Sequence, residues 1–337
     1  MAKRGGEQQD IMPEEEILPL RRALLAWYRQ NRRDLPWRKD HDAYRVWVSE
    51  IMLQQTRVAA VLEHYRLFLE AFPSIEVLAA DEESQVLARW SGLGYYRRAR
   101  LLHKAARTVM RELGGNIPEN AAGLRRLEGV GRYTAAAIAS IACGEAVAVV
   151  DGNVERVLAR LDGRPREGEA VWQRAQELLD PRHAGDWNQA MMELGAMVCT
   201  PRAPQCLACP VHEWCRAPGA DTSRAQEERK RVRMARALVT NAGRVYLAQR
   251  EAGASKMAGM WELPELASGA ERDGEVLCTL RHSITDTDYE VHIVALPLRL
   301  LKAAEKRGGR WVDVANLAKL PLTGLTRKAL RRQGLLA

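Results

Sequence analysis

The spacing of apolar residues predicts that the first two thirds of the chain are helical. Apolar and polar positions alternate at helical spacing from Tyr44 to Phe72, and Pro73 ends this pattern. Runs of β-branched residues, which favour strands, are scarce between residues 14 and 215. We therefore expect an all-α part of about 215 residues. Two further predicted helices, each followed by helix-breaking residues, are Ala99–Leu113 before Gly114-Gly115 and Ala170–Leu179 before Asp180-Pro181.

The pattern changes to that of strands beyond residue 233. Arg236–Thr240 and Arg244–Arg250 flank the turn-forming residues Asn241-Ala242-Gly243, which predicts a β-hairpin. Tyr289–Leu296 alternates with period two, as a half-buried strand does. Residues 218–232 are polar and charged, which is typical of a linker. The predicted domains are thus an all-α domain at 1–217 and a smaller α+β domain at 233–337.

Length and composition agree with this division. A chain of 337 residues exceeds what one hydrophobic core usually organises, and 47% hydrophobic with 28% charged residues is typical of a soluble globular protein. The N-terminus lacks the apolar segment of a secretory signal, and no run reaches the roughly 18 apolar residues that a membrane span needs. We expect a cytoplasmic protein (nucleoid-associated if bacterial) that does not contact a membrane.

The net charge of +8 permits an acidic partner but does not require one. The first 220 residues are almost neutral, and the basic excess lies beyond them. If the partner is a nucleic acid, we expect the C-terminal domain to supply part of the salt-dependent contact.

Four of the six cysteines lie close together in the sequence, at Cys199, Cys206, Cys209 and Cys215. In a reducing compartment such a group is more typical of metal binding than of disulfides. Four thiolates can hold a cuboidal iron–sulfur cluster or a tetrahedral zinc ion. Structural zinc usually pairs two short Cys-x-x-Cys units, and only Cys206 and Cys209 form one here. The spacing favours the cluster, with zinc as the alternative and an unliganded loop as the least favoured interpretation.

Gly129-Val130-Gly131 lies between two helical segments and is a candidate phosphate-binding turn. Glycines let a ligand approach the backbone, and the helix that follows offers free N–H groups at its N-terminus. Arg125, Arg126 and Arg132 add positive charge nearby. A plain connection between two helices explains the same pattern equally well.

Two carboxylates are candidates for acid–base chemistry. Glu50 lies within the otherwise apolar stretch Val46–Thr56, so it is either on a solvated stripe or partly buried with a raised pKa, as a general acid requires. Asp151 follows the apolar run Ala146–Val150 and precedes a predicted helix. The simpler roles are a surface position for Glu50 and a helix cap for Asp151.

Taken in order, these segments resemble the endonuclease-III-type helix-hairpin-helix DNA glycosylases, and most closely the MutY family of adenine DNA glycosylases. The resemblance covers about Leu20 to Ala217 and is weaker beyond. It implies two helical lobes, a [4Fe–4S] cluster on the four cysteines, and a C-terminal domain related to Nudix hydrolases. The motifs that carry it are Leu35–Arg38, Val48–Thr56, Gly92–Ala99, Leu127–Thr134, Val150–Val154, the four cysteines and, in the C-terminal domain, Gly259–Pro264.

The resemblance implies base excision repair, in which adenine mispaired with 8-oxoguanine (or guanine) is flipped out of duplex DNA and removed. Glu50 would protonate adenine, Asp151 would stabilise the sugar, Asn153 would orient the carboxylates and Tyr133 would hydrogen-bond near Asp151. Gln55 and Tyr95 would wedge into the duplex. The residues implied to line the adenine pocket are Trp37, Arg38 and Gln189, and those implied to contact DNA are Leu53, Gln55, Tyr95, Arg97, Gly129, Val130 and Gly131.

Tyr133 separates two branches of these relatives. The bifunctional enzymes that act on damaged pyrimidines carry a Lys at the matching position, whose amine forms a Schiff base and allows strand cleavage. A tyrosine predicts a monofunctional glycosylase that leaves an abasic site. We also expect the protein to act on DNA as a monomer. The alternatives are a bifunctional pyrimidine-lesion glycosylase and a non-catalytic mismatch-binding module. A Nudix pyrophosphatase is disfavoured because its Arg-Glu-x-x-Glu-Glu cluster is not found in the sequence.

The sequence departs from the family after His282. Ile284-Thr285-Asp286 stands where the family usually presents a Phe-Ser-His loop that senses 8-oxoguanine. Thr285 keeps a hydroxyl for the lesion, but Asp286 places an acid near the phosphates. We therefore expect weaker discrimination between 8-oxoguanine and guanine.

Overall fold

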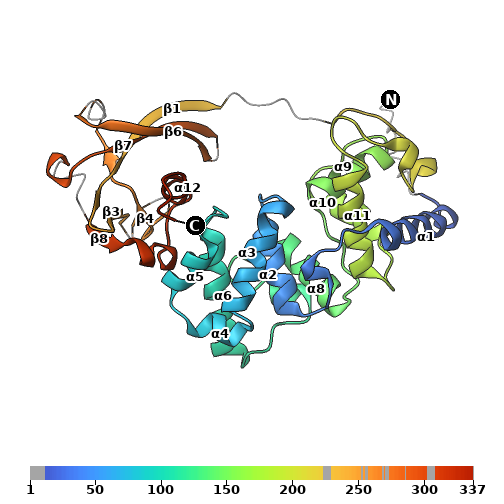
Figure 1. Ribbon diagram of the computed structural model, residues 1–337. Coiled ribbons are helices and arrows are strands. Elements are labelled where there is room, and N and C mark those ends of the chain that lie inside the picture. Colours follow the sequence, from blue (N-terminus) through green and yellow to red (C-terminus); the bar gives the residue numbers. More distant parts are fainter. Residues whose placement is uncertain are drawn as a thin grey trace, which may run out of the picture. The chain divides into compact units, whose positions relative to one another are not determined.

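The computed structural model describes residues 12–222, 229–251, 253–254, 257–267, 269, 273–284, 286–301 and 308–336. The chain forms two compact units, each made of two segments that lie far apart in the sequence. The first unit joins residues 1–50 and 117–224, and the second unit joins residues 51–116 and 225–337. The boundary between these two segments of chain falls after Glu50, within helix α2 (Ala43–Leu53), which is labelled in Figure 1. Among the described helices, none is both long and apolar enough to span a membrane.

The first unit is helical throughout its described part. Its elements are α1 (Glu14–Asn31), η1 (Pro36–Arg38), α7 (Ala121–Leu124), α8 (Arg132–Cys143), α9 (Gly152–Leu161), α10 (Glu169–Leu178), α11 (Ala184–Met197), η2 (Cys206–Ala208) and η3 (His212–Trp214). Helix α11 packs against α1, α8 and α9. The buried side chains Tyr28 of α1, Leu158 of α9 and Trp187 of α11 belong to the core between these helices. The predicted helix over Ala170–Leu179 is confirmed as α10.

Small residues let α11 approach its neighbours closely. A methyl group added at Gly185 would lie 2.7 Å from the carbonyl oxygen of Ser140 in α8, and one added at Gly195 would lie 2.6 Å from Cβ of Asn153 in α9. Helix α8 adds four buried alanines to this contact, Ala135, Ala136, Ala137 and Ala139. The first turn of α11 therefore meets the C-terminal part of α8, and the C-terminal half of α11 meets the first turn of α9.

The helical segment of the second unit comprises α3 (Val58–Ala71), α4 (Ile75–Ala80), α5 (Glu83–Trp90) and α6 (Arg97–Leu113). The ring of Phe68 packs edge-to-face on those of Phe72 and Trp90, at centroid distances of 4.9 and 5.7 Å. Helix α6 confirms the helix predicted over Ala99–Leu113. It ends at Gly114, whose φ of 60° is the left-handed conformation that commonly terminates helices.

The helical spacing from Tyr44 to Phe72 does not correspond to one helix. Helix α2 ends at Leu53 and α3 begins at Val58. Gln55 lies between them with a φ of 54°, which no helix can accommodate in its interior. The spacing of apolar residues does not report a single left-handed residue, so the break was not predicted.

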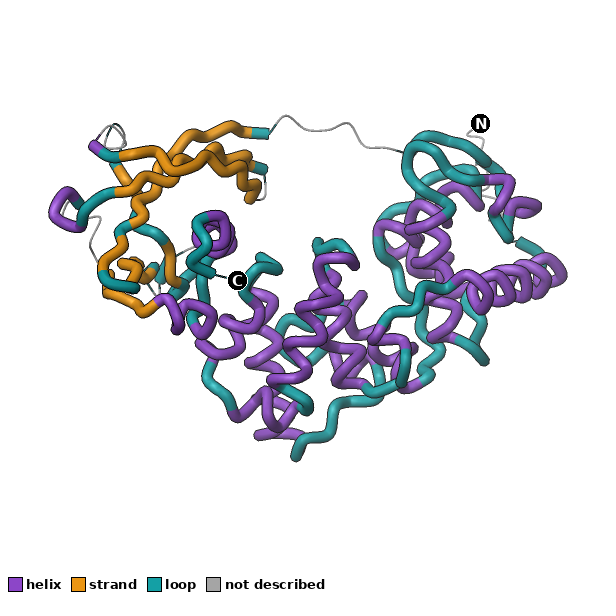
Figure 2. The backbone as a smooth tube through the Cα atoms, in the orientation of Figure 1, coloured by secondary structure: helices purple, strands orange, loops and turns teal. Residues whose placement is uncertain are grey.

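The strand segment of the second unit contains two sheets (Figure 2). In the first sheet the order is β5-β1-β7-β6, with β1 parallel to β7 and β6 antiparallel to β7. In the second sheet β3 pairs with β2, β4 and β8. The strands are β1 (Lys230–Leu238), β2 (Thr240–Asn241), β3 (Arg244–Gln249), β4 (Trp261–Glu262), β5 (Glu265–Leu266), β6 (Glu275–Ile284), β7 (Thr287–Ala295) and β8 (Gly309–Asp313).

Three further elements complete this segment, η5 (Leu298–Leu300), η6 (Val314–Lys319) and α12 (Gly324–Arg332). A smaller α+β part therefore follows the helical part, as predicted. Its relation to Nudix hydrolases stays a prediction.

The predicted hairpin around Asn241-Ala242-Gly243 is only partly right. Strands β2 and β3 pair across Ala242 and Gly243, which have φ values of 45° and 74°, as a tight hairpin turn requires. However, β1 belongs to the other sheet, so the chain passes from one sheet to the next between Leu238 and Thr240. A local pattern identifies a strand without identifying its partner.

Ser91, which follows α5, joins the helical and strand segments of the second unit. Its hydroxyl donates to the carbonyl oxygen of Leu322 at 2.7 Å and accepts from Nε of Arg327 at 3.0 Å. The hydroxyl of Tyr96 donates to the same carbonyl at 3.3 Å. Ser91 and Tyr96 are both buried, so these bonds fix the turn between α5 and α6 to the segment that leads into α12.

The close contact between α11 and α8 gives a testable prediction. We expect Gly185→Ala to destabilise the protein by about 1–3 kcal/mol, the usual cost of overpacking, because the added methyl meets backbone atoms that cannot rotate away. Urea unfolding followed by circular dichroism measures this. Gly152→Ala in α9 is the matched control, since open space surrounds its added methyl. If Gly185→Ala and Gly152→Ala lose the same free energy of unfolding, α11 and α8 do not approach each other this closely.

Candidate active site

Glu50 lies in α2 among apolar residues and is only 6% exposed. Val46, Trp47 and Val48 of the same helix are buried with it. Because burial removes the hydration of the carboxylate, it raises the pKa of Glu50 to about 7. The sequence left open whether Glu50 lies on a solvated stripe or is buried, and the structure shows that it is buried. There its carboxyl group can both hold and release a proton near neutral pH.

The hydroxyl of Tyr133, in the first turn of α8, donates a hydrogen bond to Oε2 of Glu50 at 2.8 Å. This bond stabilises the ionised carboxylate and offsets part of the effect of burial on the pKa of Glu50. Burial, together with the charges of Glu50 and Asp151, raises the pKa of Tyr133 well above its usual value, so the phenol stays protonated. The sequence placed this hydroxyl near Asp151, but its carboxylate partner in the structure is Glu50.

Asp151 is the N-cap of α9. Its Oδ1 accepts from the backbone N–H groups of Asn153 and Val154 at 2.9 and 2.8 Å, and its Oδ2 accepts from Nδ2 of Asn153 at 2.9 Å. The charge of Asp151 also contributes to the raised pKa of Glu50, which places the two carboxyl groups in one site. The cap therefore fixes Asp151 without removing it from the site, because a carboxylate has more acceptor positions than the cap uses.

Asn153 also connects Asp151 to the loop that carries the cysteines. Its Oδ1 accepts from Nη2 of Arg156 at 2.8 Å, and Nε of Arg156 donates to the carbonyl oxygen of Cys199 at 2.7 Å. Nη2 of Arg156 also donates to the carbonyl oxygen of Gly195 at 2.6 Å. A chain of hydrogen bonds thus runs from Asp151 through Asn153 and Arg156 to the first cysteine.

Arg38 is held by Glu193, a residue that the sequence analysis missed. Nη2 of Arg38 lies 2.9 Å from Oε2 of Glu193, and Nη2 of Arg33 lies 2.7 Å from the same oxygen. Burial alone would raise the pKa of Glu193, but the hydrogen bonds from Arg33 and Arg38 outweigh it and lower that pKa to about 2. Glu193 therefore stays ionised and fixes the orientation of Arg38.

The other residues predicted to line the adenine pocket, Trp37 and Gln189, are buried in the same unit, at 6% and 8% exposure. Nε2 of Gln189 donates to the carbonyl oxygen of Gly185 at 3.3 Å. In the sequence Glu193 is flanked by apolar residues, Ala190–Met192 and Leu194, which is a signal of the same kind as that of Glu50. The signal is weak, because the same helix also contains Asp186, Asn188 and Gln189.

The turn Gly129-Val130-Gly131 connects α7 to α8, as predicted. Gly129 has a φ of 75°, a conformation that favours glycine. Gly131 is the N-cap of α8 and has no side chain to occupy the first N–H groups of the helix. No heavy atom lies within 4 Å of the position that a methyl group at Gly131 would take. These features suit an approaching phosphate.

The three arginines around this turn differ in how available their charge is. Arg132 forms an ion pair with Glu169 at 2.5 Å and lies over the ring of Trp172, 4.0 Å from its centroid. Arg125 and Arg126 are exposed. The positive charge that the sequence assigned to Arg132 is therefore balanced by Glu169.

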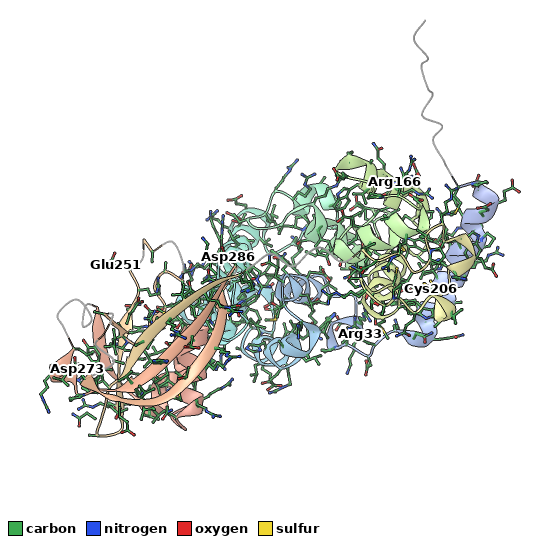
Figure 3. The ribbon with its side chains drawn as sticks, turned by 90° about the horizontal axis from the view of Figure 1, so that it is seen from above. Arg33, Arg166, Cys206, Glu251, Asp273 and Asp286 are labelled. Atoms are coloured by element: carbon green, nitrogen blue, oxygen red, sulfur yellow. The ribbon has the colours of Figure 1, made fainter. Side chains whose placement is uncertain are left out.

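The four cysteines lie on the loop that follows α11, where Figure 3 labels Cys206, and three of them pack against the core of the first unit. Arg160, which is 2% exposed, donates from Nη1 to Sγ of Cys199 at 3.1 Å and to the carbonyl oxygen of Thr200 at 2.9 Å. Burial, together with the neighbouring thiols of Cys199, Cys206 and Cys215, raises the pKa of Cys209 to about 11, so the four side chains are near one another. In the part of the chain that the structure describes, no three His, Cys, Asp or Glu side chains surround a single ion position.

Residues 48–181 match the family model described as HhH-GPD superfamily base excision DNA repair protein. A solved structure of a thermostable thymine-DNA glycosylase is 30% identical with a TM-score of 0.56, and the match covers 60% of this chain and 96% of that chain. The chain belongs to the HhH-GPD superfamily. Endonuclease III in a non-covalent complex with DNA shares the fold of this HhH-GPD protein, with a TM-score of 0.53 and 21% identity over 61% of this chain and 96% of that chain.

Among the curated relatives of this HhH-GPD protein are several named adenine DNA glycosylase. The one from Homo sapiens is 49% identical over 217 residues, which cover 60% of this chain and 40% of the human protein. The one from Arabidopsis thaliana is 44% identical over 245 residues, which cover 63% of this chain and 39% of the plant protein. The matches thus span about two fifths of the length of these relatives.

The remaining predicted DNA contacts of the HhH-GPD protein lie in the second unit. Gln55 and Tyr95 are both exposed, Tyr95 to 46%, and both adopt left-handed conformations, with φ values of 54° and 49°. Arg97, at the start of α6, is exposed as well, whereas Leu53 at the end of α2 is partly buried. Of the side chains that the sequence assigned to the duplex, those of Gln55, Tyr95 and Arg97 are thus at the surface. That of Leu53 is partly buried, and that of Val130, in the glycine turn, is buried at 6% exposure.

Thr285, the residue predicted to contact the lesion, lies outside the described residues. Its neighbour Asp286 lies at the opposite end of the long strands β6 and β7 from Asp273 (Figure 3). Oδ1 of Asp286 accepts from the hydroxyl of Thr287 at 3.0 Å. Asp288, nearby in β7, pairs with Arg229 at 2.8 Å. The negative charge of Asp288 at this end of the sheet is thus balanced by Arg229.

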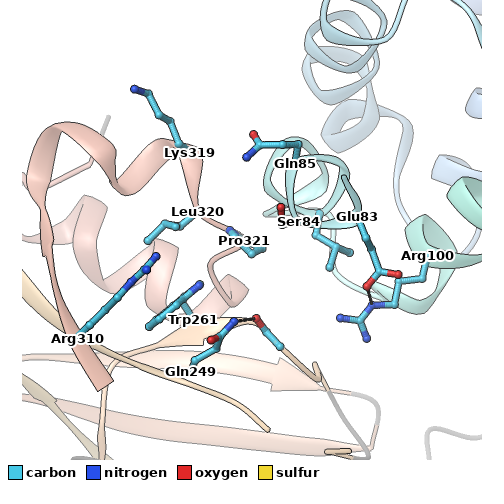
Figure 4. Close-up of a pocket in the computed structure, with 12 residues that line it drawn as sticks. Glu83, Ser84, Gln85, Arg100, Gln249, Trp261, Arg310, Lys319, Leu320 and Pro321 are labelled. Atoms are coloured by element: carbon cyan, nitrogen blue, oxygen red, sulfur yellow. Dashed lines mark hydrogen bonds and ion pairs between the residues drawn. The ribbon is translucent and has the colours of Figure 1, made fainter. Parts of the chain in front are cut away.

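A pocket of about 420 Å³ lies in the second unit, between the start of α5 and the strand segment (Figure 4). Glu83 in this pocket pairs with Arg100 at 2.9 Å, and Arg310 lies over the ring of Trp261, 4.4 Å from its centroid. Its described lining includes none of the residues that the sequence assigned to catalysis, adenine or DNA. This pocket is therefore not the candidate active site.

The burial of Glu50 makes the stability of the protein depend on pH. Its pKa of about 7 in the folded protein exceeds its ordinary value of 4.5, so the folded state binds this proton more tightly than the unfolded state does. Stability is therefore lost as the pH rises from about 4.5 through about 7. We expect Glu50→Gln to raise the free energy of unfolding by up to about 3 kcal/mol above pH 7, and by little near pH 4.

Urea unfolding of wild type and variant across this pH range measures the difference. Glu119→Gln is the control, because Glu119 is exposed and should show no such pH dependence. If Glu50→Gln is instead less stable than wild type at high pH, the bond with Tyr133 outweighs burial and the site does not favour a protonated carboxyl group.

Proposed function

We propose that this HhH-GPD protein is a monofunctional adenine DNA glycosylase. In this proposal it removes adenine mispaired with 8-oxoguanine, or with guanine, from duplex DNA in the cytoplasm and leaves an abasic site. The observation that carries the proposal is the buried carboxyl group of Glu50, whose pKa of about 7 suits a group that gives and takes a proton at neutral pH. The relatives named adenine DNA glycosylase support adenine as the base.

In the first step, Glu50 protonates the extruded adenine at N7 and the bond between N9 and C1′ of the sugar breaks. The electron pair of that bond stays with adenine, which leaves as a neutral base. The hydroxyl of Tyr133 donates to Oε2 of Glu50, so Oε1 is the oxygen that carries the proton toward the base. Tyr133 therefore orients the general acid as well as lowering the cost of its ionisation.

Asp151 then stabilises the positively charged sugar that remains. Its oxygens are held by the first turn of α9 and by Asn153, so the negative charge is in place before the positive charge develops. Retaining glycosidases use such a carboxylate either through electrostatic attraction or as a nucleophile that forms a transient covalent bond. Both routes are open to Asp151 and lead to the same product.

Water completes the reaction by adding to C1′. Glu50, now ionised, accepts a proton from that water, so the enzyme returns to its starting state and one water is consumed for each adenine released. Tyr133 occupies the position of the Schiff-base lysine in bifunctional relatives, and a phenol cannot form an imine. The proposed product is therefore an abasic site in an intact strand.

We propose that Cys199, Cys206, Cys209 and Cys215 hold a [4Fe–4S] cluster. The loop fits this group because its four thiols lie close enough to influence one another and three of them pack against the core. A cuboidal cluster binds one cysteine at each of its irons, so its ligands need not converge on one point as the ligands of zinc must. When bound, the cluster supplies a rigid fold for the loop, to which Arg156 and Arg160 are already hydrogen-bonded.

The proposed partner is duplex DNA that contains an adenine mispair, bound by a single copy of the chain. Gln55 and Tyr95 are proposed to enter the duplex, and the N-terminus of α8 to receive a phosphate. The extruded adenine is proposed to contact three side chains, Trp37, Arg38 and Gln189. Thr285 is the proposed contact to the lesion.

Adenine release from defined duplexes tests the proposed function. We expect the purified protein to release adenine opposite 8-oxoguanine and opposite guanine, and not from an adenine–thymine pair, in single-turnover assays read by alkaline cleavage at the abasic site. Because Ile284, Thr285 and Asp286 replace the usual lesion-sensing loop, the preference for 8-oxoguanine should be less than about tenfold, which corresponds to about 1.4 kcal/mol. Release of thymine from a thymine–guanine mispair, without release of adenine, would contradict the proposal.

Two controls in the same assay separate the alternatives. Glu50→Gln should lower adenine release by at least about a hundredfold and leave binding to the mispaired duplex intact, since it removes the proton but not the DNA contacts. Unchanged release by this variant would rule out Glu50 as the acid. Efficient trapping of wild-type protein on DNA by borohydride would show a Schiff base and favour the bifunctional alternative.

Metal analysis tests the proposed cluster. We expect about four iron and four sulfide ions per chain in protein purified without oxygen, and loss of both in Cys206→Ser. Cys278→Ser, which lies outside the loop, is the matched control and should retain the iron. One zinc ion per chain in place of iron would contradict the cluster and favour the tetrahedral alternative.

A further inference from the structure

Gln55 and Tyr95, the two residues proposed to enter the duplex, share an uncommon backbone conformation. Their φ values of 54° and 49° lie in the left-handed region, which costs free energy for any residue with a Cβ. Both side chains are exposed and so gain little from packing. Such conformations persist where the surrounding structure fixes them. The left-handed conformations of Gln55 and Tyr95 must therefore be held by contacts of the turns in which they lie.

Arg98, in the first turn of α6, holds the turn that contains Gln55. Its Nη1 donates to the carbonyl oxygens of Ile51 and Met52 at 2.7 and 3.0 Å. The same nitrogen donates to the carbonyl oxygen of Gln54, the residue directly before Gln55. These carbonyls belong to the last turn of α2 and to the residues after it, where a helix leaves carbonyl groups without helical partners.

The other terminal nitrogen of Arg98 holds the turn that contains Tyr95. Nη2 donates to the carbonyl oxygen of Gly94, directly before Tyr95, at 3.3 Å, and to the hydroxyl of Thr56 at 3.1 Å. Nε1 of Trp90 donates to the same carbonyl of Gly94 at 3.1 Å. The guanidinium carbon lies 5.3 Å from the ring centroid of Tyr95 and 5.5 Å from that of Trp90. One planar group thus bonds to the backbone on the N-terminal side of both strained residues.

The charge of Arg98 is directed at backbone oxygens. In the described part of the chain no carboxylate pairs with it, and the C-terminal end of α2 presents the negative end of a helix dipole. Burial lowers the pKa of Arg98 to about 10, so the side chain is still protonated at neutral pH. The two terminal nitrogens therefore keep their positive charge as they donate to the two turns, whereas Nε is buried and has no hydrogen-bond partner among the described residues.

We propose that Arg98 is a positioning residue for base extrusion. Its bonds to Gln54 and Thr56 in one turn and to Gly94 in the other hold the two turns in one fixed arrangement, so that Gln55 and Tyr95 enter the duplex together. The proposal rests on the proposed function. The planar fork of arginine is needed for it, since a lysine ammonium supplies the same charge but not two separated terminal nitrogens.

Arg107 provides a matched control in the same helix. Its Nε and Nη2 donate to the carbonyl oxygens of Ala79 and Asp81 at 3.1 and 2.9 Å, at the end of α4. It stabilises the end of a helix as Arg98 does, but none of the residues proposed to contact DNA lies in that turn. Arg107→Met therefore reports what the loss of such contacts does to stability alone.

Adenine release from two duplexes tests the proposal. One carries adenine opposite guanine, and in the other the same adenine faces an abasic-site analogue, so no opposing base must be unpaired. Arg98→Met and Arg98→Lys should release adenine at least about tenfold more slowly from the first duplex and less than about threefold more slowly from the second. Arg107→Met should release adenine from the two duplexes with the same ratio of rates as the wild type. This should hold even if its unfolding temperature falls as much as that of Arg98→Met.

A second readout follows extrusion without chemistry. In the Glu50→Gln background, 2-aminopurine in place of the mispaired adenine should gain less fluorescence with Arg98→Met than with Arg107→Met. The proposal is overturned if Arg98→Met slows adenine release equally on the two duplexes. It is also overturned if Arg98→Met and Arg107→Met show the same gain in fluorescence. The proposed function stands in both cases. If the wild-type protein releases adenine from neither duplex, the proposed function fails and this proposal falls with it. If Arg98→Met is unfolded at the assay temperature, the ratio of the adenine release rates of Arg98→Lys on the two duplexes tests the proposal instead.

Discussion

A carboxyl group buried in a helical core is the constraint on which the candidate site depends. Ionised Glu50 has lost most of its hydration, and only nearby donors can offset that cost. The hydroxyl of Tyr133 is such a donor, and it reaches Glu50 because α8 begins beside α2. The position of α8 depends in turn on its close contact with α11 at Gly185. The proton transfer proposed for Glu50 therefore relies on small residues outside the proposed contacts to the base and the sugar.

Arginine side chains show why the net charge is a poor measure of DNA affinity in this protein. Several donate to backbone carbonyl oxygens within their own unit: Arg21 to Leu178, Arg98 to Gln54, Arg107 to Ala79, Arg156 to Cys199 and Arg160 to Ala220. These guanidinium groups hold loops and helix ends in place. Exposed residues such as Arg97, Arg125 and Arg126 remain for phosphates. The charge of +8 thus combines internal hydrogen-bond donors with surface cations that have a different role.

The sequence predicted those parts whose signal is local. Helix α6 and its end at Gly114 follow from periodicity and from a glycine that tolerates a left-handed conformation. The glycine turn before α8 was found for the same reason. The break at Gln55 was missed because its conformation accompanies hydrogen bonds from Arg98, which lies 44 residues from Gln54 in the sequence. Glu193 was missed because its partners, Arg33 and Arg38, lie 160 and 155 residues away in the sequence. The prediction of a strand at Arg236–Thr240 found only the end of β1, and residues 230–232 at its start had been assigned to the linker. Its partner strands could not be read from a pattern that describes one strand at a time.

Asp151 shows that a structural and a catalytic explanation of one residue can both hold. A helix cap needs a side-chain oxygen that accepts from the first N–H groups, and it stabilises a helix by about 1 kcal/mol. A catalytic anion needs an orientation that does not change when the opposing charge appears. The bonds to Asn153 and Val154 satisfy both needs, because the donors that end the helix also prevent the carboxylate from rotating. An aspartate in a loop would have to be ordered during the reaction, whereas Asp151 is ordered by folding. Capping is thus the means by which this residue becomes suitable for catalysis.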